Sequence, residues 1–280
     1  ARYRGQLNTY LRMGALIQKD AGEVNYLDFK SIFIEIKPNR WLDKIIFGDF
    51  INQWGQGLVQ SGGFSLGKSF ESIKATQKFH LGAIPYTSSG ETSFYRGFNI
   101  QFHLGSLNFQ AFSSIRNLDA SLSTDSTDNS KQINSWIEDG YHRTSTEISH
   151  QSNVAETAWG GSMQWIHKPT HLAIQFNLSH TLFSLEKSKS TLAYKANSWS
   201  GNQVKNYSIS FQAPIYTIHF TGEFAWMPEN HFSLIQGGAF AASKKVDLSY
   251  LLRYYSPSYF SPKAQGIGEG TETTNEVGLF

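Results

Sequence analysis

Charged residues inside otherwise alternating apolar stretches are the positions of this sequence that could do chemistry. If such stretches are strands crossing a membrane, a charge that faces lipid at mid-bilayer costs about 2–4 kcal/mol. We therefore expect the in-strand charges to face inward, either lining a polar pore and setting its selectivity or pairing with one another in a plugged interior. Both alternatives fit the six residues concerned, which are Arg12, Glu35, Asp49, Glu223, Asp247 and Arg253.

A second candidate group combines glycine with amide side chains directly after one of these charges. Gly48-Asp49 is followed by Gln53, Gly55, Gln56 and Gly57. The segment 54–72 could bend inward and constrict a lumen. Alternatively, the glycines mark a bulged strand end, where they permit the backbone to bend. We favour the bulged strand end.

Residues 62–69, Gly-Gly-Phe-Ser-Leu-Gly-Lys-Ser, match the P-loop pattern, in which backbone N–H groups and a lysine hold phosphates. The context differs from that of a P-loop, because no buried parallel strand precedes the motif and no clear helix follows it. We therefore expect a glycine-rich loop here.

His142 and Arg143 come just before Thr144-Ser145-Thr146-Glu147, which has the pattern of a helix capping box heading a short helix in a loop. The pair could bind an anion or position a partner. Loop packing and capping explain the same residues, and we favour that explanation. The nine histidines show no pair at metal-ligand spacing on one face with a carboxylate, so we predict no metal site and no cofactor.

Catalysis is not predicted. Serine and histidine are frequent, but no fixed constellation distinguishes any of them, and hydrolytic sites are identified by geometry and not by sequence position. We therefore name no catalytic residue. A hydrolase embedded in a barrel stays as an alternative.

The composition excludes several classes of protein. The 280 residues include only 16% charged side chains, against a usual value of about 25%, but 15% aromatic ones. This aromatic content at a net charge of +2 excludes a disordered chain. The absence of cysteine excludes a disulfide scaffold, and no apolar run of about 18 residues indicates a membrane helix. A net charge of +2 also gives no broad basic surface for nucleic acid.

The hydrophobic pattern has a period of two residues, which predicts β-strands. Over 172–179, large apolar residues alternate with alanine, glutamine, asparagine and serine, and the ranges 7–18, 98–104 and 246–255 repeat the alternation. Segments of about ten residues with this pattern are typical of transmembrane strands. We predict about fourteen, near 6–18, 28–37, 42–53, 73–83, 95–104, 107–116, 132–138, 157–167, 172–183, 205–213, 215–226, 232–241, 245–255 and 274–280.

A soluble β-sandwich also alternates, but we favour a membrane barrel. The strands are long, and aromatic residues cluster at their ends, as at Trp41, Trp54 and Trp165. Short links alternate with long ones, as in outer-membrane barrels, which would place the start of the first strand in the periplasm. Two links break the rule: 105–106 is too short and 117–131 is too long, so one middle strand is wrongly placed.

The two folds differ in where four apolar residues lie. A membrane barrel turns Leu7, Phe98, Ile174 and Leu248 outward, whereas a sandwich buries them between two layers.

Several motifs of the chain stand in a distinctive order and spacing. They are 18–23 (Gln-Lys-Asp-Ala-Gly-Glu), 48–50 with 53–58, 67–69, 86–88 with 94–97, 139–144 with 147–148, and 275–279. In this order and spacing the chain resembles the β-barrel portion of Bacteroidota outer-membrane proteins that carry a periplasmic helix-hairpin-helix region, often labelled ComEA-like. The resemblance extends from about residue 5 to the end.

The resemblance implies an outer-membrane location and little about activity. The helix-hairpin-helix label suggests DNA binding, but in a segment that this sequence does not contain. Strands expected after Leu279 are also absent, so we expect a fragment of a larger barrel. Double-stranded DNA needs a lumen wider than about 20 Å and phosphate-contacting cations, and 24 basic against 22 acidic residues provide no such surplus.

We therefore predict a single all-β domain over 1–280, an antiparallel transmembrane β-barrel in a Gram-negative outer membrane. Its predicted role is that of a channel or scaffold subunit of an envelope complex, with DNA uptake or other macromolecular transport as the alternative. The predicted partners are outer-membrane lipid, lipopolysaccharide and other envelope proteins. Nucleic acid would bind only through the absent periplasmic segment.

Overall fold

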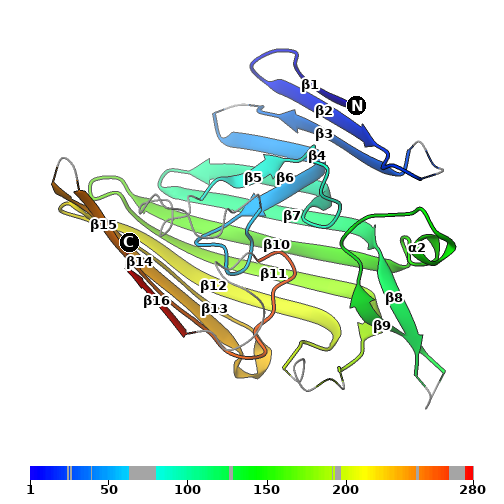
Figure 1. Ribbon diagram of the computed structural model, residues 1–280. Helices are drawn as coiled ribbons and strands as arrows, with labels where there is room; N and C mark the ends of the chain where they lie inside the picture. The colour runs from blue at the N-terminus through cyan, green and yellow to red at the C-terminus, as the bar shows by residue number, and fades with distance from the viewer. Residues whose placement is uncertain are drawn as a thin grey trace.

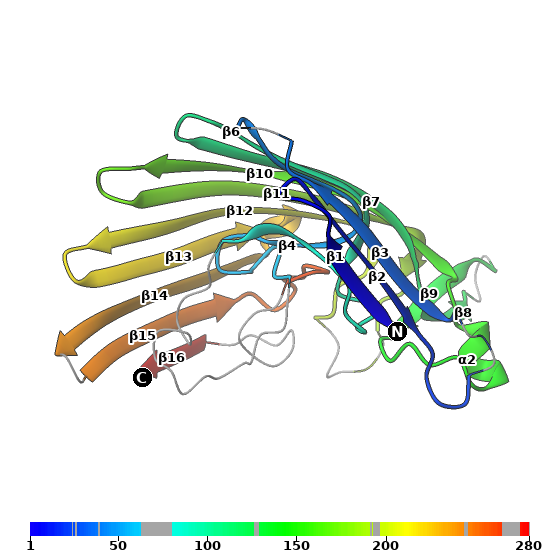
Figure 2. The same cartoon turned by 90° about the horizontal axis from the view of Figure 1, so that it is seen from above.

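The chain forms one curved antiparallel sheet. The computed structural model describes residues 1–23, 25, 27–38, 40–62, 80–125, 129–190, 192, 197–243, 246–264 and, for the backbone, 275–279. Thirteen strands follow one another along the sheet from β1 to β16, and three more, β5, β8 and β9, lie off this path. In the described part of the chain no pairing joins β1 to β16, so the sheet curls without closing (Figures 1 and 2).

The strands on the path are long, as predicted. Their bounds are β1 Arg2–Gln6, β2 Leu11–Gln18, β3 Phe29–Ile36, β4 Leu42–Gln53, β6 Tyr95–Leu104, β7 Leu107–Leu118, β10 Val154–His167, β11 Leu172–Lys187, β12 Gly201–Ile215, β13 Ile218–Trp226, β14 Phe232–Ser243, β15 Val246–Tyr255 and β16 Asn275–Leu279. The predicted 42–53 and 95–104 coincide with β4 and β6.

The outer face of this sheet is apolar and exposed. On this face Phe98, Ile174 and Leu248 are 36, 41 and 43% exposed, and Leu7, in the link that follows β1, is 64% exposed. In a sandwich these side chains would be covered by a second layer. The all-β, antiparallel fold of the barrel type is therefore confirmed.

The opposite, concave face carries small and polar side chains with apolar ones between them. On β11, Gln175, Asn177 and Ser179 are buried, while the residues between them on the outer face are partly or fully exposed. Apolar inner residues from many strands form one cluster that includes Phe50, Phe112 and Ile235. The period-two pattern thus separates a lipid-like exterior from a mixed interior.

Links between neighbouring strands on the path differ in length at the two ends of the sheet. At one end, the short-turn end, they comprise residues 7–10, 37–41, 105–106, 168–171, 216–217 and 244–245. At the other, the long-loop end, they comprise 19–28, 54–94, 119–153, 188–200, 227–231 and 256–274. Gly105 has φ +64°, which suits the two-residue turn at 105–106.

Two predicted irregularities disappear once the side strands are recognised. The predicted strand 73–83 does not separate β4 from β6, which pair directly. Residues 73–79 lie outside the described residues, and β5 (Gly82–Pro85) pairs only with β4 on this part of the sheet. Similarly, β8 (Ala120–Thr124) and β9 (Lys131–Trp136) form a hairpin within the long link between β7 and β10. The turn 105–106 is therefore a regular short link.

The predicted first strand, 6–18, is wrong in one respect. Residues 7–10 turn the chain between β1 and β2, because the Asn8 side chain accepts hydrogen bonds from the backbone N–H groups of Tyr10 and Leu11, both at 2.8 Å. Strand β2 starts at the short-turn end, as predicted for the first strand. The extra strand β1 places Ala1 beside Ile17, at the long-loop end.

The helices of the described chain are short. Helix α2 (Ser145–Ser149) is capped by Thr144 with the predicted capping box complete, and it is a short helix in a loop, as predicted. The other is a single 3-10 turn, η2 (Pro228–Asn230). Neither has the length and apolar character of a membrane-spanning helix.

Candidate functional site

Two segments far apart in the sequence cross the concave face of the sheet. We call residues 54–62 and 256–264 the inner segments. They pair with each other, since Ser61 N–H donates to the carbonyl of Lys263 at 2.9 Å and Tyr259 Oη donates to the carbonyl of Leu58 at 2.8 Å. In both views they lie on the concave side of the strands (Figures 1 and 2). The interior of the sheet is therefore filled by the chain itself.

Glu223 on β13 anchors the first inner segment. Its buried carboxylate accepts the backbone N–H groups of Gln56 at 2.7 Å and Leu58 at 3.1 Å. Gly55 lies directly against it, because a Cβ at this position would be 2.8 Å from Glu223 Oε2. Charge-assisted hydrogen bonds of this kind are about twice as strong as neutral ones. An in-strand charge and the glycine-amide motif, named separately from the sequence, thus meet here.

Polar side chains of other strands hold the same segment. Trp54 Nε1 donates to Gln110 Oε1 at 2.9 Å, and Gln60 Nε2 donates to Tyr95 Oη at 2.7 Å and to Ser179 Oγ at 3.0 Å. All five side chains are buried. The structure therefore places Gln56 and Gly57 in a folded inward turn, and not in the bulged strand end that we favoured. Residues 63–72 of the predicted constriction lie outside the described residues, as does the P-loop-like motif beyond Gly62.

Buried charges that sequence reasoning did not name hold the second inner segment. Arg116 Nε donates to Glu156 Oε2 at 2.7 Å, and Lys263 Nζ lies 3.3 Å from the other oxygen of the same carboxylate. Burial lowers the pKa of Lys263 to about 8, with Arg116 adding to the effect and Glu156 opposing it. Both Arg116 and Glu156 continue the inward alternation, but the predicted strands ended at 116 and began at 157, which hid the pairing.

A cavity of about 280 Å³ lies beside these charges at the long-loop end. Arg116, Glu156 and Lys263 line it together with the rings of Trp136 and Phe260. It is the space between the second inner segment and the wall of the sheet.

Five of the six predicted in-strand charges stand at inner-face positions. Glu35 is buried between Arg12, at 3.4 Å, and Lys37, at 3.6 Å. Arg253 is buried on β15, whereas Asp247 is exposed at the start of that strand. Of the five, Glu35, Glu223 and Arg253 are buried, whereas Arg12 and Asp247 are exposed. The continuous pore lining that was one alternative does not follow from this set.

Asp49 does not line the interior. Strand β4 leaves β3 after the pair of Phe33 with Gly48, where Gly48 has φ +95°. Asp49 fills the resulting seam, where it binds Arg96 Nε at 2.8 Å and accepts the backbone N–H of Ile32 at 3.3 Å. Asp49 follows the exposed Phe47 on the outer side of the β4 alternation, so its carboxylate enters the seam and not the lumen. Gln53 at the end of β4 is partly buried.

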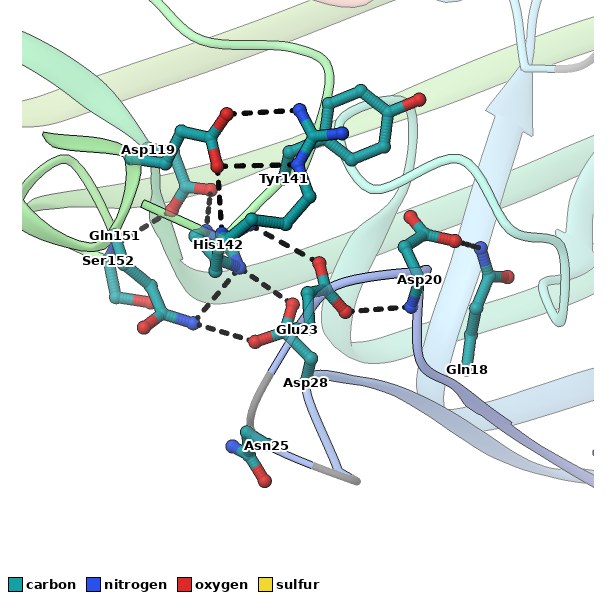
Figure 3. A network of polar contacts seen from close by, with 12 residues as sticks. Gln18, Asp20, Glu23, Asn25, Asp28, Asp119, Tyr141, His142, Gln151 and Ser152 are labelled. Atoms are coloured by element: carbon teal, nitrogen blue, oxygen red, sulfur yellow. Dashed lines mark hydrogen bonds and ion pairs between the residues drawn. The ribbon is translucent and has the colours of Figure 1, made fainter. Parts of the chain in front are cut away.

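His142 lies in an acidic cluster at the long-loop end (Figure 3). Its Nδ1 is 2.6 Å from Asp28 Oδ2 and its Nε2 is 2.9 Å from Asp119 Oδ2, while Glu23 Oε1 accepts its backbone N–H at 3.3 Å. Burial alone lowers the pKa of His142, but the hydrogen bonds with Asp28 and Asp119 outweigh burial and raise it. Because carboxylates occupy both sides of the ring and would repel an anion, the predicted alternative of an anion site at His142 is wrong.

Arg143 points away from this cluster. Its guanidinium binds Glu147 Oε1 at 3.0 Å and stacks over the ring of Tyr141 at 4.0 Å. The Glu147 carboxylate also accepts the backbone N–H groups of Arg143 and Thr144, which completes the capping of α2. Arg143 therefore packs and caps the loop, as we favoured.

Comparisons with known proteins return distant likenesses of structure. No family model and no curated protein matches the chain. Among solved structures it is similar to OmpT, an outer membrane protein of Vibrio cholerae, with 10% identity over 98% of this chain and 83% of that one at a TM-score of 0.36. It is also similar to a mutant porin of Rh. blastica, with 9% identity over 99% and 86% of the two chains at a TM-score of 0.32.

The fold and location follow from the geometry of the chain itself. An exposed apolar outer face, a polar inner face, and short and long links at opposite ends are together the features of the wall of a bacterial outer-membrane β-barrel. The chain has this fold, and its place is the outer membrane.

Proposed function

We propose that this protein is a barrel subunit with a closed interior, acting as a scaffold in an envelope complex and not as an open diffusion channel. The observation that carries the proposal is the pair of inner segments held across the concave face. A water-filled pore leaves its lining in contact with solvent, whereas Asn99, Asn177 and Ser208 on the inner face have no solvent-exposed surface. A plugged interior is one of the known states of outer-membrane barrels.

Charge on the inner side argues against transport of nucleic acid. The buried acids Glu35, Glu156 and Glu223 accompany the buried bases Arg116 and Arg253. A path for DNA needs a surplus of lysine and arginine facing phosphate. The described interior has no such surplus, so DNA uptake is the weaker alternative.

Conductance in planar lipid bilayers tests the proposal. We expect the wild-type protein to show no stable conductance steps at low voltage. The double variant Glu223→Ala/Tyr259→Phe removes the carboxylate that holds Gln56 and Leu58 and the hydroxyl that holds the Leu58 carbonyl, so it should open intermittently. Glu186→Ala, on the exposed outer part of β11, is the matched control and should stay silent. Large, long-lived steps from the wild type would contradict a closed interior.

A second measurement tests the scaffold role. The protein should be cross-linked to the same envelope proteins in intact outer membranes whether or not its double variant conducts, because the inner segments do not form its outer surface. Recovery of only the uncross-linked monomer under these conditions would contradict the scaffold role.

A further inference from the structure

The cluster around His142 joins two of the links at the long-loop end, 19–28 and 119–153. Glu23 and Asp28 belong to the link between β2 and β3, Asp119 follows β7, and His142 precedes α2. Figure 3 shows Asp28 and Asp119 at the imidazole and Glu23 at the backbone of the same histidine. Glu23 and His142 are buried, and the side chain of Asp28 is only 3% exposed. The cluster lies apart from the inner segments, and the proposed function does not use it.

Both nitrogens of the His142 ring face carboxylate oxygens at hydrogen-bond distance, at 2.6 and 2.9 Å. A neutral imidazole has one N–H and one lone pair, so it can donate to only one of them. The other contact joins a lone pair to a carboxylate, and such a contact needs a cation between the two. That cation is either a second proton or a metal ion.

Several neighbours decide which ring nitrogen carries the hydrogen. The Asp119 carboxylate is itself held by the backbone N–H of Ser152 at 2.6 Å, which aims its other oxygen at Nε2. A histidine that binds a metal commonly donates its second N–H to a carboxylate held in this way. Nδ1 then turns its lone pair toward Asp28 and Glu23. Gln151 Nε2 donates to the remaining oxygen of Asp28 at 3.2 Å and also lies 3.2 Å from Nδ1, so this amide must turn toward Asp28 alone when an ion takes the Nδ1 lone pair.

We infer that Glu23, Asp28 and His142 form a binding site for a divalent transition-metal ion of the Zn²⁺ type, with Asp119 positioning the histidine. One ligand atom from each of the three residues lies within 4.8 Å of the others. Zinc bonds of about 2.0–2.2 Å to imidazole and carboxylate span such a set after small shifts of the side chains. An imidazole ligand favours Zn²⁺ over Ca²⁺ or Mg²⁺, which prefer oxygen.

Charge balance favours the metal over the second proton. A proton on His142 offers one positive charge to the three carboxylates of Glu23, Asp28 and Asp119, whereas a divalent ion offers two. Uncompensated buried charge is costly, so the site gains more from the ion. By its position, the ion would tie together the loops that the three ligands come from.

Zinc uptake by the full chain in detergent micelles tests the inference. After chelator treatment, equilibrium dialysis against Zn²⁺ should give one ion per chain, and His142→Gln should lower the affinity at least tenfold. His150, which follows the last residue of α2, lies outside the cluster, so His150→Gln should leave the affinity unchanged. Uptake that His142→Gln and His150→Gln affect equally would overturn the site.

Near-isosteric variants keep the test decisive if His142→Gln fails to fold. Asp28→Asn and Glu23→Gln should each weaken Zn²⁺ binding, and Asp119→Asn should weaken it through the lost orientation of the ring. Zn²⁺ should also raise the melting temperature of the wild type and not that of Asp28→Asn. No uptake by the wild type would show that a proton alone fills the contact, and equal binding of Ca²⁺ would refute the proposed ion class.

Discussion

Glu223 shows how one buried carboxylate can fix a segment that the sequence leaves undetermined. Its Oε2 accepts the backbone N–H groups of Gln56 and Leu58. Because backbone groups have no sequence signature, the pattern of in-strand charges indicated its inward direction but not its partner. The same limit applied to Asp119, which holds both a histidine and a backbone N–H.

Replacement of Glu223 should destabilise the folded protein. Glu223→Ala leaves two buried N–H groups without their acceptor, at a cost of about 1–3 kcal/mol for each. Glu223→Gln keeps a carbonyl oxygen in place and should lose less. Chemical denaturation in micelles measures both, with Glu186→Ala as the exposed control. Equal stability of Glu223→Ala and Glu186→Ala would show that the inner segment does not depend on this anchor.

Glu91 should make the long-loop end less stable at higher pH. Burial raises the pKa of Glu91 from 4.5 to about 7, and the nearby Asp28, Asp119 and Glu23 add to this effect. The folded state therefore holds this proton more tightly, so the contribution is complete below pH 4.5 and is lost as the pH rises through about 7.

The melting temperature, measured with chelator present, should therefore fall between pH 5 and pH 8. Glu91→Gln should flatten that fall, because it removes the pH-dependent contribution of this carboxyl to the free energy of unfolding. Solvent screens the partly exposed carboxyl, so that contribution is on the order of 1 kcal/mol. Asp139→Asn, at an exposed position, is the control and should leave the slope unchanged. If Glu91→Gln and Asp139→Asn give the same slope, Glu91 does not titrate in this range.

At the scale of elements, the seam between β3 and β4 depends on a single glycine. Gly48 has φ +95°, and a Cβ there would clash with the carbonyl oxygen of Ile32. Gly48→Ala should cost on the order of 1–3 kcal/mol through strain and should weaken the Asp49–Arg96 pair. Gly105 also has a positive φ, but a Cβ there would meet only open space. Gly105→Ala should therefore destabilise the protein less than Gly48→Ala. Thermal melts that rank Gly105→Ala as the more harmful change would contradict this account of the seam.

The outer face of β11 offers a depth-matched test of lipid contact. Phe176 lies on the outer face near the middle of the strand, and Ser184 lies on the same face toward the long-loop end. Phe176→Arg should cost about 2–4 kcal/mol on folding into lipid vesicles, whereas Ser184→Arg should cost about 0–1 kcal/mol. Equal costs at the two positions would mean that the face does not cross a bilayer.

Period-two alternation was enough to predict most strands of the path, because one exposed apolar face and one covered polar face impose it directly. It could not show that β5, β8 and β9 pair away from the path. It missed the break between β1 and β2, because the turn depends on the Asn8 side chain. The His142 cluster was hidden for a different reason: its members are separated by up to 119 residues along the chain and meet only through loop packing.

At the scale of the whole molecule, two surfaces define the protein. The convex surface is apolar and exposed, and the concave surface is polar and covered by the inner segments. Loops at the long-loop end carry the His142 cluster, whereas the short-turn end has links of two to five residues. We interpret this division as one between a wall that faces lipid, an interior that the chain fills itself, and one end that is built for contacts.

Accessibility of single spin labels along β11 tests this account most directly. The chain has no cysteine, so one cysteine at a time can be introduced at 174–179 and labelled in lipid bilayers. We predict that dissolved oxygen reaches labels at Ile174, Phe176 and Leu178 readily. At Gln175, Asn177 and Ser179 we predict low access of both oxygen and a water-soluble nickel reagent. Accessibility without a two-residue period, or an outer face open to the nickel reagent, would contradict a wall that faces lipid on one side and a filled interior on the other.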